Sequence, residues 1–482
     1  MQKGTASTGF MNFGKYFFWY FLSTVLSTVI GLIKSPIFTD RFSPENFGYY
    51  SLVFVSYTFL SIVFLNWTSL SLWRFYHKAK SENKLPVLYI TLGYKFGLSC
   101  IWFMLIAAVA LFFVPGALLR KLVIWGCFFM ISNVAVQFML AHLRIENKAK
   151  AYNVIVCAQA IASFLLLLYL TLGMGYGIET FFASPVIVNL LLLLGFAVYQ
   201  LPRFKKADIK QDKTLGQQIV RYGQLLIWAN LSLSLLSNVD RYLVQFFKGA
   251  YATGIYNQLY MLGQMLTITL IQVFFSTVNP GYTKMLEFKP ADFSERLSKL
   301  VQTYLVIYVP IGVYAIIFAQ DISTILLRGD FVRYYYLLPP IVIGNILYGL
   351  TNFFEIKLKF EDKRKKLFLF YGVAVAFNVL LNAVMLSRYS FEAAAYVTMA
   401  TYLLLFVLFY LDDLKQFLNA RTIIPLFPMF ATLALQILVH LLVRYVWPVL
   451  PIWVSILEGI LFVVIYILVI KKKFDFSAVV TD

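Results

Sequence analysis

Residues 143–150 read Leu143-Arg-Ile-Glu-Asn-Lys-Ala-Lys150, and residues 358–365 repeat the pattern as Leu358-Lys-Phe-Glu-Asp-Lys-Arg-Lys365. Both stretches combine a leucine, a basic residue, an apolar residue, a glutamate, an asparagine or aspartate, and two lysines. A second match, Gly48-Tyr-Tyr50 with Gly254-Ile-Tyr256, keeps the same order at a similar spacing. Two matches in one order predict that the chain contains an internal duplication.

The composition of the chain is that of a protein that lies in lipid. Of its 482 residues, 61% are hydrophobic and 13% are charged, whereas an ordinary globular domain carries about 25% charged residues. One helical crossing of a bilayer needs roughly 20 apolar residues. The sequence therefore predicts an all-α integral membrane protein.

The apolar runs, cut at clusters of charge, predict about fourteen transmembrane helices. Their approximate bounds are 16–38, 48–72, 87–113, 122–141, 152–172, 180–200, 222–247, 254–278, 300–319, 337–356, 367–387, 391–411, 423–443 and 452–470. The connections between them are too short to hold an extramembrane catalytic or nucleotide-binding domain.

The positions of the lysines and arginines predict the orientation of these helices. Most of the 41 basic residues fall in alternate connections, and positively charged loops resist translocation, so those connections and both termini are expected to be cytoplasmic. The net charge of +19 is concentrated in such short loops, for example 203–206 and 363–366. Topology and anionic lipid headgroups account for it, and no nucleic-acid partner is expected.

The duplication divides the predicted helices into two sets of six. The predicted organisation is an N-lobe at 1–202, a cytoplasmic linker at 203–221, a C-lobe at 222–411, and a final segment at 412–482 with two further spans and a cytoplasmic tail. Because the two sets have the same orientation, they are expected to be related by a parallel repeat about an axis along the membrane normal. Folds of this kind place the transported substrate between their halves.

Motifs for soluble or metal-dependent chemistry are absent from the sequence. There is no GxxxxGK[ST], HExxH or GxSxG pattern, and the three histidines, His77, His142 and His440, are predicted to have structural or interfacial roles. The three cysteines fall within predicted spans without metal-binding or disulfide spacing. No catalytic residue, metal site or cofactor is therefore predicted.

Four stretches carry a resemblance to a known family: 38–50, which reads Phe-Thr-Asp-Arg-Phe-Ser-Pro-Glu-Asn-Phe-Gly-Tyr-Tyr, then 143–150, Asp240-Arg-Tyr242 and Gly254-Ile-Tyr256. With them, essentially the whole chain resembles the polysaccharide-exporter and O-antigen flippase family of the multidrug/oligosaccharidyl-lipid/polysaccharide superfamily, whose members are similar to MATE transporters. The resemblance implies a V-shaped pair of six-helix lobes around a cavity that opens alternately to each side of a bacterial cytoplasmic (inner) membrane.

Family members with two additional helices typically move undecaprenyl-diphosphate-linked oligosaccharide from the inner to the outer leaflet for surface polysaccharide assembly. The resemblance therefore implies that cargo, together with membrane lipids, as partners, and it leaves a coupling cation open. The physics agrees, because a diphosphate-sugar headgroup cannot cross hydrocarbon without a hydrophilic path. Three alternatives stay open: a peptidoglycan lipid-precursor flippase, a cation-coupled multidrug exporter, and a multispanning glycan polymerase or acyltransferase.

Charges inside predicted spans are the default candidates for functional residues, since each costs about 2.5–3.5 kcal/mol near a helix centre. The repeat offset places Lys34 opposite Asp240. We hypothesise that these two side chains form an outer gate that opening breaks, and the alternative is that each reaches the outer interface.

Three further residues complete the candidate site. Lys95 and Arg241 are predicted to bind the substrate diphosphate, although Lys95 could instead reach inner headgroups and Arg241 could neutralise Asp240. Glu355 is a candidate for ion coupling. Its alternative role is an i,i+4 pair with Lys359.

Overall fold

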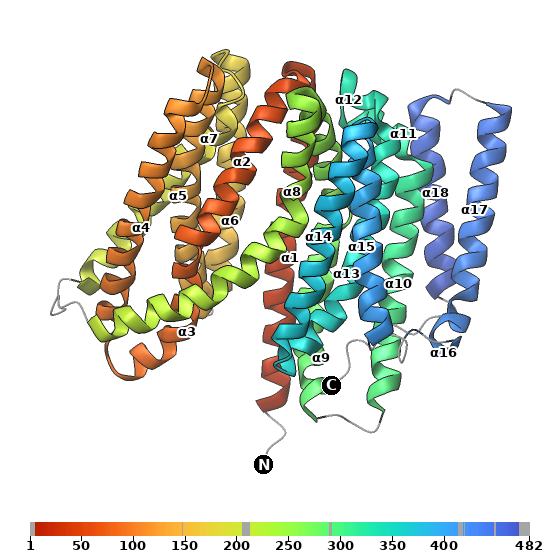
Figure 1. Cartoon of the computed structure of the whole chain (residues 1–482). Coiled ribbons are helices and arrows are strands. Elements are labelled where there is room, and N and C mark those ends of the chain that lie inside the picture. Colours follow the sequence, from red (N-terminus) through yellow and green to blue (C-terminus); the bar gives the residue numbers. More distant parts are fainter. Residues whose placement is uncertain are drawn as a thin grey trace. The chain divides into compact units, whose positions relative to one another are not determined.

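The structure is a computed structural model that describes residues 5–146, 148–204, 213–288, 292–412, 418, 420–447 and 450–471. Every regular element within these ranges is a helix (Figure 1). The first half contains α1 (Thr5–Arg41), α2 (Pro44–Phe64), α3 (Trp67–Ser81), α4 (Leu85–Phe113), α5 (Ala117–Ile145), α6 (Ala149–Leu168), η1 (Tyr169–Gly173), α7 (Thr180–Phe204) and α8 (Lys213–Leu266).

The second half continues with α9 (Ile268–Phe288), α10 (Phe293–Ile317), α11 (Ala319–Leu326), α12 (Asp330–Arg333), η2 (Tyr335–Leu337), α13 (Leu338–Phe360), α14 (Arg364–Arg388), α15 (Ala393–Asp412), α16 (Ala420–Ile423), η4 (Ile424–Leu426), α17 (Phe427–Val446) and α18 (Ile452–Lys471).

Thirteen stretches among the described residues are long and apolar enough to cross a membrane. One of them, Ser234–Phe288, has 55 residues, more than twice what a single crossing needs. It combines two predicted spans, 222–247 and 254–278. The backbone of Gly249 (φ 82°, ψ −177°) interrupts the helix between them, a conformation that glycine adopts at little cost because it has no Cβ. The prediction of an all-α protein with about fourteen membrane helices is confirmed.

The chain divides into two compact units. Unit 1 comprises Met1–Lys34 and Glu45–Tyr242, and unit 2 comprises Ser35–Pro44 and Leu243–Asp482. The predicted domain bounds follow the sequence repeat instead and stay a prediction. Most of the predicted linker, at 205–212, and the end of the predicted tail, at 472–482, lie outside the described residues.

The same arrangement of helices recurs in each unit. In unit 1, α5 packs against α3, α4, α6 and α7, and in unit 2, α13 packs against α9, α10, α14 and α15. The central helix of each set is the one that ends in the repeated basic motif. Breaks correspond as well, because Ser43 separates α1 from α2 and Gly249, at the repeat offset of 206, interrupts α8. The internal duplication predicted from the sequence is therefore confirmed.

The repeated motif builds the same turn twice. The amide of Lys148 donates to the carbonyl of Leu143, and the amide of Lys363 donates to the carbonyl of Leu358, both at 2.9 Å. The lysine at the end of each turn also pairs with the glutamate of the motif, at 2.5 Å for Lys148 and 2.8 Å for Lys363. The pattern that the two stretches share thus encodes a tight helix–turn–helix connection. Asn147 lies outside the described residues.

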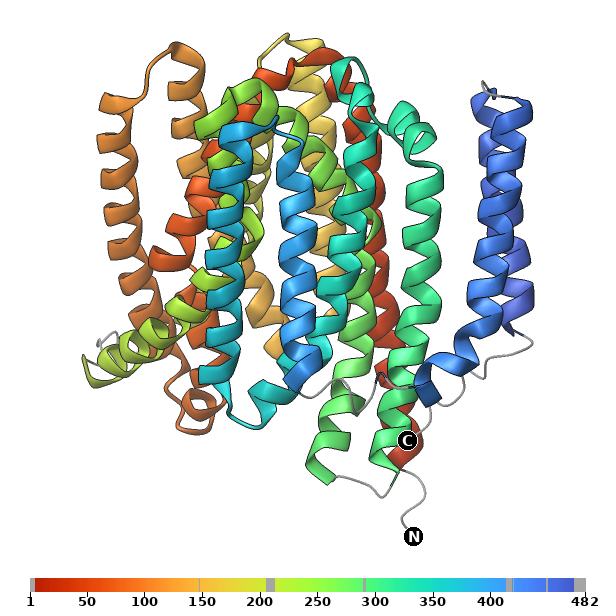
Figure 2. The same cartoon turned by 45° about the vertical axis from the view of Figure 1, so that its right-hand side comes forward.

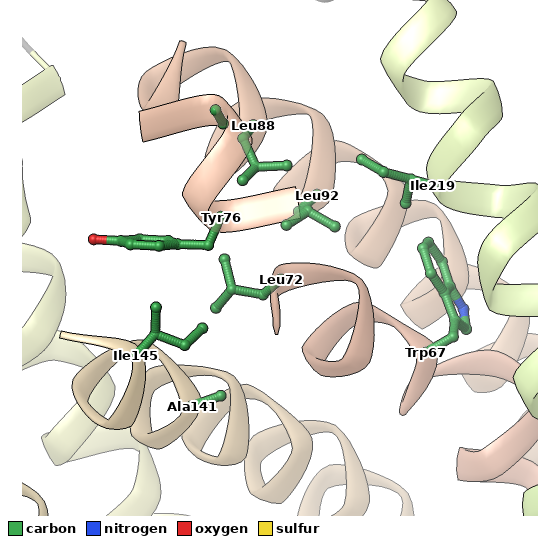
Figure 3. Packing of buried hydrophobic residues seen from close by; sticks show 9 residues of the cluster. Trp67, Leu72, Tyr76, Leu88, Leu92, Ala141, Ile145 and Ile219 are labelled. Atoms are coloured by element: carbon green, nitrogen blue, oxygen red, sulfur yellow. The ribbon is translucent and has the colours of Figure 1, made fainter. Parts of the chain in front are cut away.

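A compact apolar cluster joins α3, α4 and α5 to the first turns of α8 (Figure 3). Leu72, Leu88 and Ile219 are fully buried there. Tyr76 extends from this cluster and donates a hydrogen bond to Glu146 at 3.1 Å. Partial burial acts to raise the pKa of Glu146, but the hydrogen bond from Lys148 and the nearby His142 outweigh it and hold that pKa below its usual value. The end of α5 is thereby fixed by both apolar and ionic contacts.

The two helices beyond the repeat, α17 and α18, pack against one another (Figure 2). Met429 and Leu433 of α17 and Tyr466 of α18 are buried against Val306 of α10. The Tyr466 hydroxyl also donates to the carbonyl of Val306 at 2.6 Å. These contacts attach the additional pair to unit 2.

Candidate functional site

Lys95 lies in α4, ten residues after its first residue, or roughly 15 Å along the helix axis. Its side chain is half-buried and reaches the start of α8, since a Cβ at Gly216 would lie 3.7 Å from its Cε. Among the described residues it has no ion-pair partner. The role of Lys95 in binding a diphosphate stays a prediction.

Lys34 contacts an aromatic ring instead of a carboxylate. Its Nζ lies 4.6 Å from the centroid of the Phe181 ring, within the distance at which a cation is attracted to the face of a ring. Phe181 also packs edge-on against Tyr50, with centroids 5.3 Å apart. The gate between Lys34 and Asp240 belongs to a conformational change and stays a prediction.

Asp240 and Arg241 are buried neighbours on α8, with 2% and 4% of their surfaces exposed. Nη1 of Arg241 lies 3.8 Å from Oδ1 of Asp240 and donates to the carbonyl of Ser237 at 2.9 Å and to Asn238 Oδ1 at 2.7 Å. In this conformation the guanidinium is thus held by its own helix and by a carboxylate. The role of Arg241 in binding a diphosphate stays a prediction.

Glu355 of α13 is nearly buried and accepts two hydrogen bonds. Lys359 donates to Oε1, and the Tyr371 hydroxyl of α14 donates to Oε2 at 2.7 Å. The i,i+4 contact that the sequence offers as the structural alternative therefore forms, and Tyr371 joins it from a second helix. A role of Glu355 in ion coupling stays a prediction.

The site predicted from the sequence contains only charged residues and omits uncharged polar residues that lie inside the membrane spans. On α14, Nδ2 of Asn382 donates a hydrogen bond to Oδ1 of Asn378 at 3.0 Å. Nδ2 of Asn378 in turn donates to Oγ1 of Thr401 on α15, also at 3.0 Å. Oδ1 of Asn382 is buried and accepts no hydrogen bond from a described residue. Their signal in the sequence is two asparagines at i,i+4 within an apolar run, which a search for charges does not detect.

Comparison with solved structures identifies the fold of the protein. The lipid II flippase MurJ in an inward closed conformation superposes with a TM-score of 0.63 and 14% identity, covering 95% of this chain and 99% of that chain. An inward-facing MATE-family multidrug resistance transporter of the MOP superfamily gives 0.57 and 15%, covering 82% and 94%. A mutant of the MATE transporter VcmN from Vibrio cholerae gives 0.54 and 13%, covering 86% and 99%. The chain thus has the fold of MOP-superfamily transporters.

The family is defined by the sequence itself. Residues 13–286, more than half of the chain, match the family described as polysaccharide biosynthesis protein. No curated protein matches the sequence in a direct search. The chain is a member of the polysaccharide biosynthesis protein family, and its helices are those of a multi-pass membrane protein.

Proposed function

We propose that this protein is a flippase that moves undecaprenyl-diphosphate-linked oligosaccharide from the inner to the outer leaflet of a bacterial cytoplasmic membrane by alternating access. The observation that carries the proposal is the family match over 13–286 in a chain built from membrane helices. Polysaccharide biosynthesis needs its lipid-linked intermediates on the far side of the bilayer. A chain of transporter fold supplies that step and not glycosyl transfer.

The charges of the candidate site support an anionic cargo. Lys95 and Lys34 both lie in membrane-spanning segments, and neither has an ion-pair partner among the described residues. A cation without a counterion is costly in a bilayer. An ammonium that meets the diphosphate of the cargo would recover that cost as a charge-assisted hydrogen bond.

Lys95→Gln tests this part of the proposal. In liposomes that contain the purified protein and a fluorescent undecaprenyl-diphosphate oligosaccharide, the variant is expected to expose cargo on the outer leaflet about tenfold more slowly, since a hydrogen bond to a charged group contributes about 1.5–3 kcal/mol. Lys95→Arg should retain most of the rate because it keeps the charge.

Lys84→Gln is the matched control. Lys84 precedes the same helix, is 56% exposed on its side chain and pairs with Glu82 at 3.0 Å, so its loss should leave the rate close to that of the wild type. Equal rates for Lys95→Gln and the wild type would remove Lys95 from the cargo path.

A further inference from the structure

A buried acid–base pair lies within the two helices beyond the repeat. Nδ1 of His440 on α17 lies 3.1 Å from Oε1 of Glu458 on α18, and their side chains are 7% and 10% exposed. Both residues fall in membrane-spanning segments. Ionisable groups at such depth are rare and usually functional.

The second carboxylate oxygen of Glu458 has no hydrogen-bond donor among the described residues. This oxygen, Oε2, is buried. A buried carboxylate oxygen without a donor is unfavourable when the group is ionised. The geometry therefore favours a state in which a proton is shared by this carboxylate and the imidazole.

The other charged groups around the pair already neutralise one another. On α17, Arg444, one turn beyond His440, pairs with Asp321 of α11 and donates to Ser455 of α18 at 3.2 Å. At the α10–α11 connection the ring of Phe318 packs against His440, with the two ring centroids 4.9 Å apart. One turn before His440 on α17, Gln436 accepts a hydrogen bond from the Tyr314 hydroxyl at 2.8 Å.

Charge balance then specifies how many protons the pair holds. With Arg444 and Asp321 compensating each other, the His440–Glu458 pair is neutral overall when it binds one proton, on either residue. Loss of that proton leaves a buried carboxylate, and gain of a second leaves a buried imidazolium, so either exchange changes the charge between α17 and α18 by one unit. A metal cation is a poorer fit, because an imidazolium or a nearby guanidinium would repel it.

We propose that His440 and Glu458 form a proton-binding site between α17 and α18, and that the exchange of its proton makes cargo transport depend on pH. Removing its proton weakens the contact of α17 with α18 and with Phe318 of the α10–α11 connection. The link to transport rests on the proposed flippase function, whereas the proton site itself does not.

The proton site is tested by spectroscopy on the full-length protein. The sequence contains three histidines, so selective ¹⁵N labelling of histidine in liposome-embedded protein gives few signals, and His440→Gln identifies the one from His440. Exchange of the shared proton is expected to move that signal when the pH is varied between about pH 5 and about pH 8. In Glu458→Gln the imidazole loses its counterion, and this movement should be lost.

Glu295→Gln is the matched control for a lost carboxylate. Glu295 lies on α10, is 68% exposed and pairs with Lys299, so the variant should leave the His440 titration unchanged. A His440 signal that is constant over this pH range in the wild type, or that titrates identically in Glu458→Gln, overturns the proposal.

Measurement of the flipping rate as a function of pH distinguishes a failure of this proposal from a failure of the proposed function. The flipping rate of the wild type is expected to change about fivefold or more across the same pH range, the low end of usual coupling between sites, and both Glu458→Gln and His440→Gln should abolish the change. Flipping whose pH dependence survives both variants overturns the link to transport. A titrating His440 in a protein that flips no lipid-linked oligosaccharide would instead overturn the flippase function and keep the proton site.

Discussion

Gly349→Ala is expected to lower the stability of the protein by about 1–3 kcal/mol, the usual cost of overpacking a close-packed interior. A Cβ at this position of α13 would lie 2.0 Å from the hydroxyl oxygen of Tyr304 and 2.9 Å from Cδ1 of Ile271. Tyr304 cannot move aside without loss, because it is fully buried and its hydroxyl donates to the carbonyl of Ile346 at 2.8 Å. The measurement is thermal unfolding of the detergent-solubilised protein.

A second substitution identifies the clash as the cause. Tyr304→Phe removes the hydroxyl that the new methyl group meets, at the cost of one hydrogen bond of about 0.5–1.5 kcal/mol. The double variant should therefore be less destabilised than the sum of the two single variants. Gly372→Ala on α14 is the control, since a Cβ there meets nothing within 4 Å and alanine favours a helix. Additive losses would show that the Tyr304 hydroxyl is not the obstacle.

Arg241→Met should be among the most destabilising single changes in unit 1. It removes a counterion of Asp240, a carboxylate that is 2% exposed, and breaking a buried pair typically costs about 3–5 kcal/mol. The double variant Asp240→Asn/Arg241→Gln carries no net change of charge and should recover most of this loss. Thermal unfolding of the three proteins gives the comparison.

The same double variant distinguishes two roles of Arg241, which are to neutralise Asp240 and to bind the cargo diphosphate. If the guanidinium leaves its partners on α8 to bind the cargo diphosphate, the stable double variant will still flip lipid-linked oligosaccharide at least tenfold more slowly than the wild type, in line with the loss of one charge-assisted contact. If the double variant, which has neither charge, flips the cargo at the wild-type rate, the role of Arg241 is only to neutralise Asp240.

Much of the fold could be predicted because it depends on patterns within the sequence. Apolar runs of membrane-spanning length and a motif repeated at 143–150 and 358–365 were sufficient for the helices and the duplication. Breaks inside helices were harder. The predicted span 48–72 is divided between α2 and α3, since a loss of helical backbone within an apolar stretch leaves little trace in composition.

The sequence names a candidate site residue only where a charge lies well inside an apolar run, as Lys95 does. Asp321 and Arg444 lie just beyond the predicted spans 300–319 and 423–443. Because a charge ends a predicted span, a charge at that position does not count as lying within the membrane. Their contact joins residues 123 positions apart in the chain. The pair of His440 and Glu458 depends in the same way on two helices meeting, which no local pattern encodes.

Outer-leaflet exposure of a fluorescent undecaprenyl-diphosphate oligosaccharide, followed over time in liposomes with and without the purified wild-type protein, tests the central claim most directly. We expect exposure that depends on the protein and exceeds that of a lipid II-type precursor measured in parallel. Absence of exposure for every lipid-linked cargo, together with proton- or sodium-driven efflux of a small organic cation, would contradict the claim and identify a drug exporter.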